Sequence, residues 1–450
     1  MPDFVAPQLD RCFYDELPCL AHVRRGAEAR RCAPDAVLVA VLCRVAALVT
    51  PEHRLTTARP ISLNLCGGLV APSGVGKSSA WQAARALLPD LGLRVLDGRG
   101  LGSGEGLIDA YLGTARKVSK RDDHETYERP RVADGAAFYV DEGETMIRLG
   151  LRQGSTLLQH LRTAWSGYAL SVTNANGDTN RHLADFSYAF SVCASFQATA
   201  GGVFLADAEG GTPQRFLFAS AQDREMPDVP PSWPGPFAFG SHDVLGIATA
   251  LGVDREIERE IDARHVAKHH GTSEDEALDS HGDAIRLRVA GLLAVLDALT
   301  SGSKRVFVGP REWTLAGHVT RNSAKIRQAV EAYGEAAKSE KREERARERN
   351  AEDAIRDDLA EQRLLDRVVE NFTNLVLKAW DGKLRDPNYD GPTTGAVWNA
   401  MAARDRHKVS PVDVEAKLKE REHVAPYTDG RGKKRWAPRI VARERTRPAA

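Results

Sequence analysis

The sequence lacks the features that mark membrane, zinc-binding and repeat proteins. Its apolar runs fall short of the roughly 18 residues that a membrane-spanning helix needs. The six cysteines are scattered and form no Cys-x-x-Cys pair, which argues against a zinc site and for reduced, packed thiols. No segment recurs at the period of a solenoid, and the first residues show no signal-peptide pattern. We therefore expect a cytoplasmic protein without a membrane segment.

The chain also lacks an excess of charge of either sign. Its 62 basic and 62 acidic side chains cancel, so any binding of nucleic acid must come from local basic patches. Hydrophobic residues make up 42% and charged residues 28%, which is the composition of a globular protein. A length of 450 residues predicts about two to four domains.

One short loop carries the clearest chemical signal in the sequence. It follows an apolar run at 63–70, which predicts a buried strand, and it precedes a helical pattern at 79–88. The loop consists of Ala71, Pro72, Ser73, Gly74, Val75, Gly76, Lys77, Ser78 and Ser79. Strand, glycine-bearing loop, Gly-Lys-Ser and helix in this order predict a P-loop that binds the phosphates of ATP.

The main loop positions have expected roles in phosphate and metal binding. Backbone N–H groups converge on phosphate oxygens, and Lys77 reaches the β- and γ-phosphates. The Ser78 hydroxyl is the expected ligand of Mg²⁺. Gly74 and Gly76 allow backbone angles that a side chain would disfavour. Ala71 stands where the commoner pattern has glycine.

A second apolar run, at 136–140, ends in the pair Asp141-Glu142. Such a run predicts a buried parallel strand that carries its carboxylates to the edge of the sheet where ligands bind. We expect Asp141 to hold Mg²⁺, directly or through water, and Glu142 to act as general base on the attacking water. Together with the P-loop, this pattern predicts an α/β fold with a parallel sheet and ATPase activity.

Two further segments offer candidates for contact with the γ-phosphate. The apolar run at 188–197 has a polar end, so Ser195 or Gln197 is a candidate sensor of hydrolysis, and an ordinary strand end is the alternative. Arg215 follows a glycine-proline turn and precedes a predicted strand. Its guanidinium is a candidate arginine finger for the site of a neighbouring subunit, and a local ion pair is the alternative.

The sequence predicts a β-hairpin in the segment before the apolar run at 188–197. Two short β-prone runs, at 169–173 and 179–183, flank a loop that contains Asn176 and Gly177. An Asn-Gly pair between such runs is typical of a tight β-hairpin. We expect the polar tip of this hairpin, with Arg181 behind it, to contact the DNA backbone.

Shifts in composition divide the chain. Prolines cluster at 224–240 as in a stiff linker, and charges of alternating sign at 336–363 predict an exposed helical spacer. Shorter patterns predict a strand at 93–96, helices at 107–114 and 394–404, and an exposed excursion at 117–134. We predict a helical N-terminal region at 1–60, an ATPase core at 61–223, a Pro-rich linker at 224–241, a helical domain at 242–335, the spacer at 336–363 and a winged-helix-like domain with a basic tail at 364–450.

The C-terminal segment combines helices with a basic hairpin. Three predicted helices precede the hairpin, which is the order of a winged helix. The basic residues of the hairpin are expected to contact DNA phosphates. They are Arg431, Lys433, Lys434 and Arg435. A protein-docking winged helix is the alternative, because the third helix is not itself strongly basic.

At these motifs, residues 13–330 resemble a known family. It comprises helicase-like P-loop ATPases of actinobacteria and their phages and mobile elements, long described as a domain of unknown function. The resembling segments are Phe13-Tyr14-Asp15 to Val41, Ser62-Leu63-Asn64, the P-loop, Gly104-Glu105-Gly106-Leu107, Asp141-Glu142, Gly154-Ser155-Thr156-Leu157-Leu158, Gly211-Thr212-Pro213-Gln214-Arg215-Phe216 and Arg311-Glu312-Trp313-Thr314-Leu315-Ala316.

The resemblance implies a RecA/AAA-type core that hydrolyses ATP with Mg²⁺ and unwinds DNA during replication. Helicases of this broad type are rings, here expected as a hexamer, that place an arginine across the subunit interface, which favours Arg215. In some RecA-type relatives the catalytic glutamate follows the second strand. Glu105 occupies that place, so Glu105 and Glu142 remain alternatives for the base. Family members often occur with primase–polymerase modules, which are therefore expected partners.

The sequence leaves open whether ATP drives movement. One hypothesis is a helicase or translocase that acts on single-stranded or forked DNA as a ring oligomer. The other is a non-motor ATP switch that binds DNA as an initiator, helicase loader or regulator. A partner-remodelling ATPase without a role on DNA is a third alternative.

Overall fold

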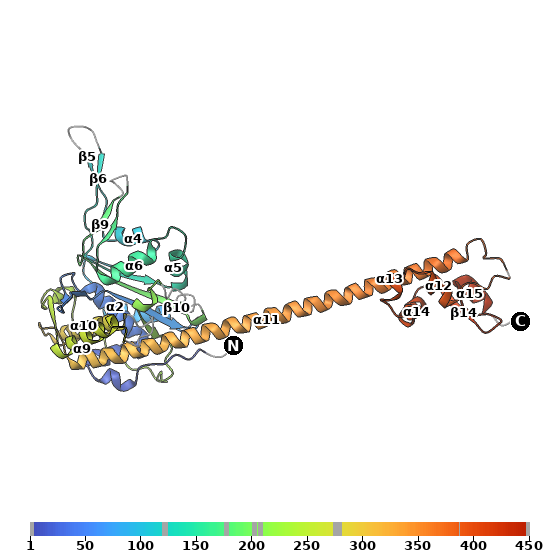
Figure 1. Ribbon diagram of the computed structural model, residues 1–450. Coiled ribbons are helices and arrows are strands. Elements are labelled where there is room, and N and C mark those ends of the chain that lie inside the picture. The colour runs from blue at the N-terminus through green and yellow to red at the C-terminus, as the bar shows by residue number, and fades with distance from the viewer. Residues whose placement is uncertain are drawn as a thin grey trace. The chain divides into compact units, whose positions relative to one another are not determined.

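The computed structural model describes residues 4–118, 125–174, 180–199, 205, 210–272, 281–386 and 388–446 (Figure 1). The chain forms two compact units, Met1–Glu340 and Lys341–Ala450, called unit 1 and unit 2 below. The finer boundaries predicted inside each unit stay predictions. Among the described residues, no helix is both long enough and apolar enough to cross a membrane.

Unit 1 is built on a sheet of five parallel strands. In spatial order these are β11 (Phe216–Ser220), β3 (Leu65–Ala71), β10 (Ala189–Gln197), β7 (Gly135–Val140) and β4 (Val95–Arg99). Every residue of β3 is buried, as expected for a strand inside a parallel sheet that is covered on both faces. Because all five strands run the same way, their carboxyl-terminal ends share one edge, called the carboxyl edge below, and their beginnings share the amino edge.

The strands predicted at 63–70, 136–140 and 188–197 are confirmed, with small shifts at their ends. Two other elements begin at different residues from those predicted. The strand predicted at 93–96 is β4 at 95–99, because Leu93 is fully exposed beside a turn. The helix predicted at 107–114 is α4 (Gly104–Asp109), because Ser103 caps it by accepting a hydrogen bond from the Gly106 N–H at 3.0 Å.

A buried helix, α2 (Pro34–Leu48), packs against the sheet and has no exposed residue. Helix α1 (Pro18–Ala29) precedes it, and both helices lie in the N-terminal region that is predicted to be helical. Helix α2 lies very close to strand β3. A Cβ atom built on Gly67 of β3 would lie 2.7 Å from Val39 Cγ1 and 2.8 Å from Cys43 Sγ. Glycine at this position therefore lets the helix lie against the strand.

The described residues of unit 1 form further helices. They are η1 (Arg11–Asp15), α3 (Lys77–Leu87), α5 (Gly143–Gly150), α6 (Leu157–Ser166), η3 (Pro213–Arg215), α8 (Ser241–Val244), α9 (Arg255–His269) and α10 (Gly282–Ser301). A second, small sheet has the order β13 (Phe307–Val308), β12 (Ala250–Val253), β1 (Arg54–Leu55) and β2 (Ile61–Ser62). This sheet joins the segment before the P-loop strand to the helical segment after residue 242.

Two antiparallel hairpins extend from unit 1 (Figure 1). One is β8 (Leu170–Val172) with β9 (Arg181–Leu183), which confirms the strands of the predicted hairpin. Its expected DNA-contacting tip, Asn176 and Gly177, lies outside the described residues. The other is β5 (Ala115–Val118) with β6 (Glu125–Glu128), in the stretch for which the sequence predicts only an exposed excursion.

The Pro-rich segment at 224–241, which is predicted as a linker, packs on unit 1. It contains two buried aromatic residues, Phe237 and Phe239. The Phe237 N–H donates to the Leu87 carbonyl of α3 at 2.7 Å, and Arg31 beside α1 donates to the Asp228 carbonyl at 2.7 Å. Proline here fixes an extended path along the surface instead of bridging solvent.

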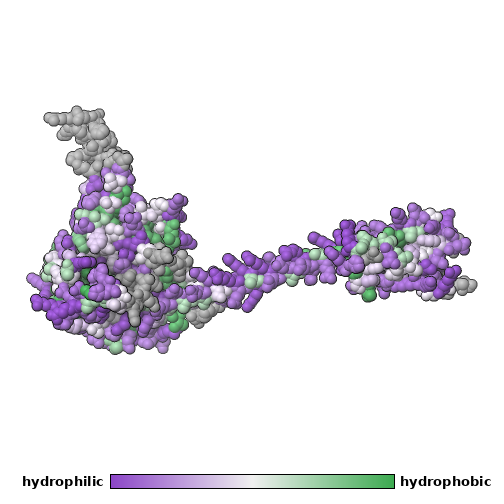
Figure 2. All heavy atoms as spheres, viewed as in Figure 1, coloured by the Kyte–Doolittle hydropathy of each residue, from purple (hydrophilic) through white to green (hydrophobic). Residues whose placement is uncertain are grey.

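A single helix, α11 (Pro310–Ala379), replaces the three pieces predicted for this region. The sequence predicts a helical domain that ends at 335, a spacer at 336–363 and a further domain that begins at 364. Between 341 and 363 every residue of α11 is exposed, and its surface is hydrophilic (Figure 2). Ion pairs such as Asp353–Arg356, at 2.8 Å, each contribute about 0.2–0.5 kcal/mol to such a helix. From 335 to 379 the sequence contains no Gly or Pro, so no helix-breaking residue interrupts this part of α11.

Unit 2 packs around two tryptophans. Trp380 Nε1 donates to the Trp436 carbonyl at 2.8 Å, and Trp436 Nε1 donates to Thr394 Oγ1 at 2.9 Å. The helix predicted at 394–404 is interrupted at Met401, and a helix follows the hairpin where a basic tail is predicted. The elements after α11 are α12 (Thr394–Ala400), α13 (Ala403–Arg406), α14 (Pro411–Glu420), β14 (Val424–Thr428), β15 (Lys434–Pro438) and α15 (Arg439–Arg445).

The close packing of α2 on β3 yields a stability prediction. Gly67→Val should lower the free energy of unfolding by about 1–3 kcal/mol, because the new side chain overlaps Val39 and Cys43. Urea unfolding followed by circular dichroism measures this change. The control is Gly102→Ala, whose Cβ meets no atom within 4 Å. If both variants unfold at the wild-type urea concentration, the packing described here is wrong.

Candidate active site

The P-loop has the backbone that the sequence predicts. It joins the end of β3 to the start of α3, at the carboxyl edge of the sheet. Gly74 and Gly76 have φ values of +80° and +69°, in the left-handed region that favours glycine. A Cβ on Gly74 would meet open space, so the backbone angle and not crowding requires glycine there. Helix α3 begins without a side-chain cap, which leaves the N–H groups of its first turn directed at the loop.

Lys77 lies over this loop. Its Nζ donates to the carbonyl oxygens of Ala71 at 3.1 Å and Pro72 at 2.9 Å. Burial lowers the pKa of Lys77, and the negative charges of Glu144 and Asp141 oppose that shift. The ammonium group is therefore within electrostatic reach of the acids that follow β7.

Asp141 and Glu142 follow β7 directly and are both exposed. Asp141 Oδ1 accepts a hydrogen bond from the Tyr139 hydroxyl at 2.7 Å. Glu142 Oε2 accepts from Thr145 Oγ1 at 3.0 Å, within the first turn of α5. The Asp141 carboxylate is thus held by Tyr139 and exposed to solvent, which suits a metal ligand. Glu142 is equally accessible to a water molecule.

A third acid, Glu144, belongs to the same edge but was missed in the sequence. Its Oε1 accepts from the backbone N–H of Gln197 at 2.6 Å, at the end of β10. A Cβ atom on Gly143 would collide with the ring of Phe196, so glycine lets α5 approach β10 closely. The available signal was the spacing Asp-Glu-Gly-Glu, in which the glycine permits the second glutamate to turn back toward the sheet.

The strand β10 lies between the P-loop strand β3 and the acid-bearing strand β7. Its last residue, Gln197, pairs with Ala71, so both sensor candidates lie between the loop and the acids. The Gln197 side chain is exposed, whereas Ser195 is buried with its Oγ 3.3 Å from the Tyr139 hydroxyl. Gln197 is therefore accessible to a phosphate, and Ser195 supports Tyr139.

Tyr139 connects helix α3 to the Asp141 carboxylate that follows β7. Its ring stacks on Trp81 of α3, with 5.0 Å between centroids and an interplanar angle of 9°. Burial raises the pKa of Tyr139, which keeps the hydroxyl a neutral donor to Asp141. The helix after the P-loop and the carboxylate after β7 are thereby held in one network. Neither aromatic residue was identified as part of the site from sequence.

Glu105, the alternative base, is bound to a different neighbour. Its Oε1 accepts from Oγ1 of Thr156, the residue directly before α6, at 2.9 Å. Hydrogen bonds from its own backbone N–H and from Thr156 lower the pKa of Glu105, with help from the charges of His160 and Arg181. The structure thus places Glu105 against α6 and β9, while Asp141 and Glu144 act on Lys77.

Arg215 lies at the amino edge of the sheet, opposite the P-loop. Phe216, the next residue, pairs with Cys66 near the start of β3. The Arg215 guanidinium donates to the Gly211 carbonyl and lies 5.4 Å from the centre of the Trp165 ring. The fold does not bring Arg215 to the P-loop of its own chain, and its role in a neighbouring subunit stays a prediction.

The predicted DNA-contacting residues differ in their local partners. In the hairpin of unit 2, Lys434 pairs with Glu415, and Arg435 pairs with the buried carboxylate of Asp429 at 2.8 Å. Arg431 and Lys433 are exposed at the turn of that hairpin. In unit 1, Arg181 pairs with Asp109 at 2.8 Å. Three of the predicted residues therefore stabilise the chain locally, and two are exposed at a turn.

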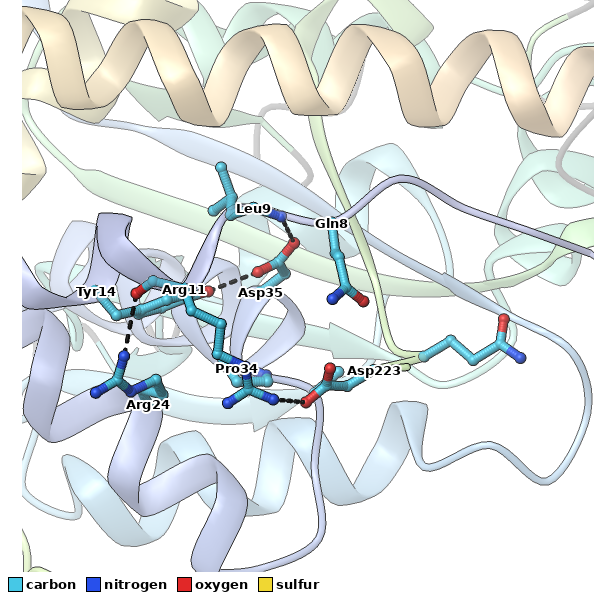
Figure 3. Close-up of a pocket in the computed structure, with 10 residues that line it drawn as sticks. Gln8, Leu9, Arg11, Tyr14, Arg24, Pro34, Asp35 and Asp223 are labelled. Atoms are coloured by element: carbon cyan, nitrogen blue, oxygen red, sulfur yellow. Dashed lines mark hydrogen bonds and ion pairs between the residues drawn. The ribbon is translucent and has the colours of Figure 1, made fainter. Parts of the chain in front are cut away.

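A small pocket elsewhere in unit 1 is too confined for a nucleotide. Figure 3 shows Tyr14 and the Leu9 N–H directed at Asp35, and Arg11 directed at Asp223. Burial raises the pKa of Asp35 to about 6. The cavity measures about 10 Å³, which is space for at most one water molecule. These groups fasten the N-terminal segment to α2 and form no ligand site.

Comparison with known proteins adds little. No family model and no curated protein matches the sequence. A solved structure of a candidate ATPase from Cytophaga hutchinsonii has a TM-score of 0.33 and 13% identity over 67% of this chain and 84% of that one. A full-length MCM homolog from Methanopyrus kandleri has a TM-score of 0.36 and 14% identity, over 73% of this chain and 64% of its own.

The three glutamates can be separated by substitution. We expect Glu142→Gln to bind ATP normally and to lower kcat by about 10²–10⁴, because it removes a general base and keeps the shape. Glu105→Gln should retain turnover, since Glu105 is bound to α6. Steady-state ATPase assays combined with nucleotide binding measure both effects. Loss of turnover in Glu105→Gln or Glu144→Gln, with Glu142→Gln active, would assign the base to that other residue.

Proposed function

We propose that the carboxyl edge of unit 1 binds and hydrolyses ATP. The observation that carries this proposal is that Lys77, on a loop with two left-handed glycines, lies within electrostatic reach of Asp141 and Glu144. The loop supplies N–H donors and an ammonium group for the phosphates, and the acids supply a metal ligand and a base. Gln197 lies between them on β10, where it would contact the γ-phosphate.

The residues at this edge fit Mg²⁺ as the metal that accompanies ATP. Ser78 and Asp141 are exposed and offer oxygen ligands, which Mg²⁺ prefers. No group of three or more His, Cys, Asp or Glu side chains that could hold a metal ion occurs within the described parts of the chain. The ion would neutralise charge on the phosphates, while Glu142 takes the proton of the attacking water.

We further propose that ATP hydrolysis drives a DNA helicase or translocase that works as a ring, expected as a hexamer. Two features support this: hairpins extend from the same unit that carries the ATP site, and Arg215 lies outside its own site, as a finger acting on a neighbour must. The family resemblance adds a replicative role in a phage or mobile element, with a primase–polymerase as partner.

The alternative function, a non-motor switch, has one observation in its favour. Unit 2 is a separate compact unit whose hairpin turn presents Arg431 and Lys433 to solvent. A winged helix that binds one DNA site would suit an initiator, a loader or a regulator as well as a motor. Both functions include DNA binding, so binding alone does not distinguish them.

Unwinding distinguishes the two functions. We expect the wild-type protein to separate a forked duplex with ATP and Mg²⁺, and Lys77→Ala to be inactive because the charge of the β- and γ-phosphates then lacks its ammonium partner. A strand-displacement assay with a fluorescent strand measures this. If the wild-type protein hydrolyses ATP and binds the fork without separating it, the result favours the non-motor switch. Strand separation by Lys77→Ala would show that this P-loop is not the ATP site that drives unwinding.

Mixing two inactive variants tests whether Arg215 acts across a subunit interface. Arg215→Ala should keep its affinity for ATP and lose about a thousandfold or more in hydrolysis. Mixed with Lys77→Ala, it should recover activity, because some interfaces then pair an intact P-loop with an intact finger. Circular dichroism controls for folding, and fluorescence energy transfer controls for subunit exchange. Absence of recovery in folded, exchanging variants would count against the finger and the ring.

A further inference from the structure

The two hairpins of unit 1 belong to different parts of the chain. The hairpin β5–β6 is inserted between α4 and β7, whereas β8–β9 lies between α6 and β10. In Figure 1 both lie on the same side of unit 1, and α4 lies near their base. Asp109, the last residue of α4, makes the contacts that join them.

Asp109 receives one arginine from each hairpin. Arg129, directly after β6, donates from its NH1 to Asp109 Oδ1 at 2.7 Å. Arg181, the first residue of β9, donates from its Nε to the same oxygen at 2.8 Å. The side chains of Asp109, Arg129 and Arg181 are 34%, 21% and 16% exposed, so water screens these bonds only in part. Charge-assisted hydrogen bonds in such surroundings are stronger than surface ion pairs.

The same helix is fastened at its other end. Gly104 packs so closely on α6 that a Cβ atom there would collide with Thr156 and His160, and Glu105 accepts from Thr156. The charge of Glu105 also acts on Arg181 and helps to raise its pKa, so both acids of α4 lie near β9. Helix α4 is therefore a short connector between α6 and the two hairpin bases.

We propose that Asp109 joins β5–β6 and β8–β9 into one arm and that this arm contacts DNA as a unit. Asp109 is a positioning residue, because it touches the arginines and not the DNA or ATP. The DNA part of the inference rests on the proposed function, and the joining of the hairpins does not. The hairpin β5–β6 thereby acquires a role that the sequence does not indicate.

A matched control exists in the same unit. Asp134, at the start of β7, also pairs with two arginines, Arg94 and Arg131. Its partners lie before β4 and between β6 and β7, so this carboxylate connects the sheet to one hairpin base and does not join two hairpins. Asp109→Asn and Asp134→Asn therefore remove the same charge and the same number of arginine partners, but only the first breaks the proposed joint.

Hydrogen exchange tests the joint without DNA. In the full-length protein, Asp109→Asn should speed backbone exchange about tenfold in both 125–132 and 181–183, because both hairpins lose their common anchor. Asp134→Asn should leave exchange in 181–183 unchanged, and Asp109→Glu should restore slow exchange. If Asp109→Asn speeds exchange in one hairpin only or in neither, the two hairpins do not form one arm.

DNA-stimulated ATPase activity tests the function of the arm. Asp109→Asn should keep basal ATP hydrolysis and lose at least tenfold of its stimulation by single-stranded DNA, with recovery in Asp109→Glu. Full stimulation in Asp109→Asn would overturn the role of the joint in DNA contact. Absence of stimulation in the wild-type protein would refute the proposed DNA function, and the exchange experiment would still decide whether the hairpins are joined.

Discussion

The parallel pairing of β3, β10 and β7 is the constraint on which the site depends. Since parallel strands end at one edge, residues far apart in the chain, such as Lys77, Asp141 and Gln197, are brought to the same place. The pairing also aligns Gln197 with Ala71 and so fixes β10 between phosphate loop and acids. Buried helix α2 holds this sheet from one face, and its contact with Gly67 sets how closely it can pack.

A close contact at Gly143 and the stacking of two aromatic rings then position the acids at the carboxyl edge of the sheet. Gly143 lets α5 lie on Phe196, which turns Glu144 toward the end of β10, and Trp81 supports the tyrosine that orients Asp141. The hairpins extend from the other end of the same strands, because β6 leads into the start of β7 and β9 into the start of β10.

The sequence predicts the P-loop, the strand before Asp141 and the two hairpins β8–β9 and β14–β15, because each depends on local patterns of apolar residues, glycine and turn residues. It misses Glu144, Tyr139 and Asp109, since their roles come from contacts with residues distant in the chain. Helix α11 runs through three predicted segments, because a change from apolar to charged composition resembles a boundary even though no residue from 335 to 379 is a helix breaker. Local patterns thus predict elements, whereas tertiary contacts complete the site.

The central claim is that the P-loop and Asp141 together bind ATP with Mg²⁺, and calorimetric titration with a slowly hydrolysed ATP analogue tests it most directly. The wild-type protein should bind at least tenfold more tightly with Mg²⁺ than with a chelator. Asp141→Asn should retain binding and lose most of this dependence, because the carboxylate ligand is absent. Equal affinity of the wild-type protein with and without Mg²⁺, or no binding in either condition, would contradict the account.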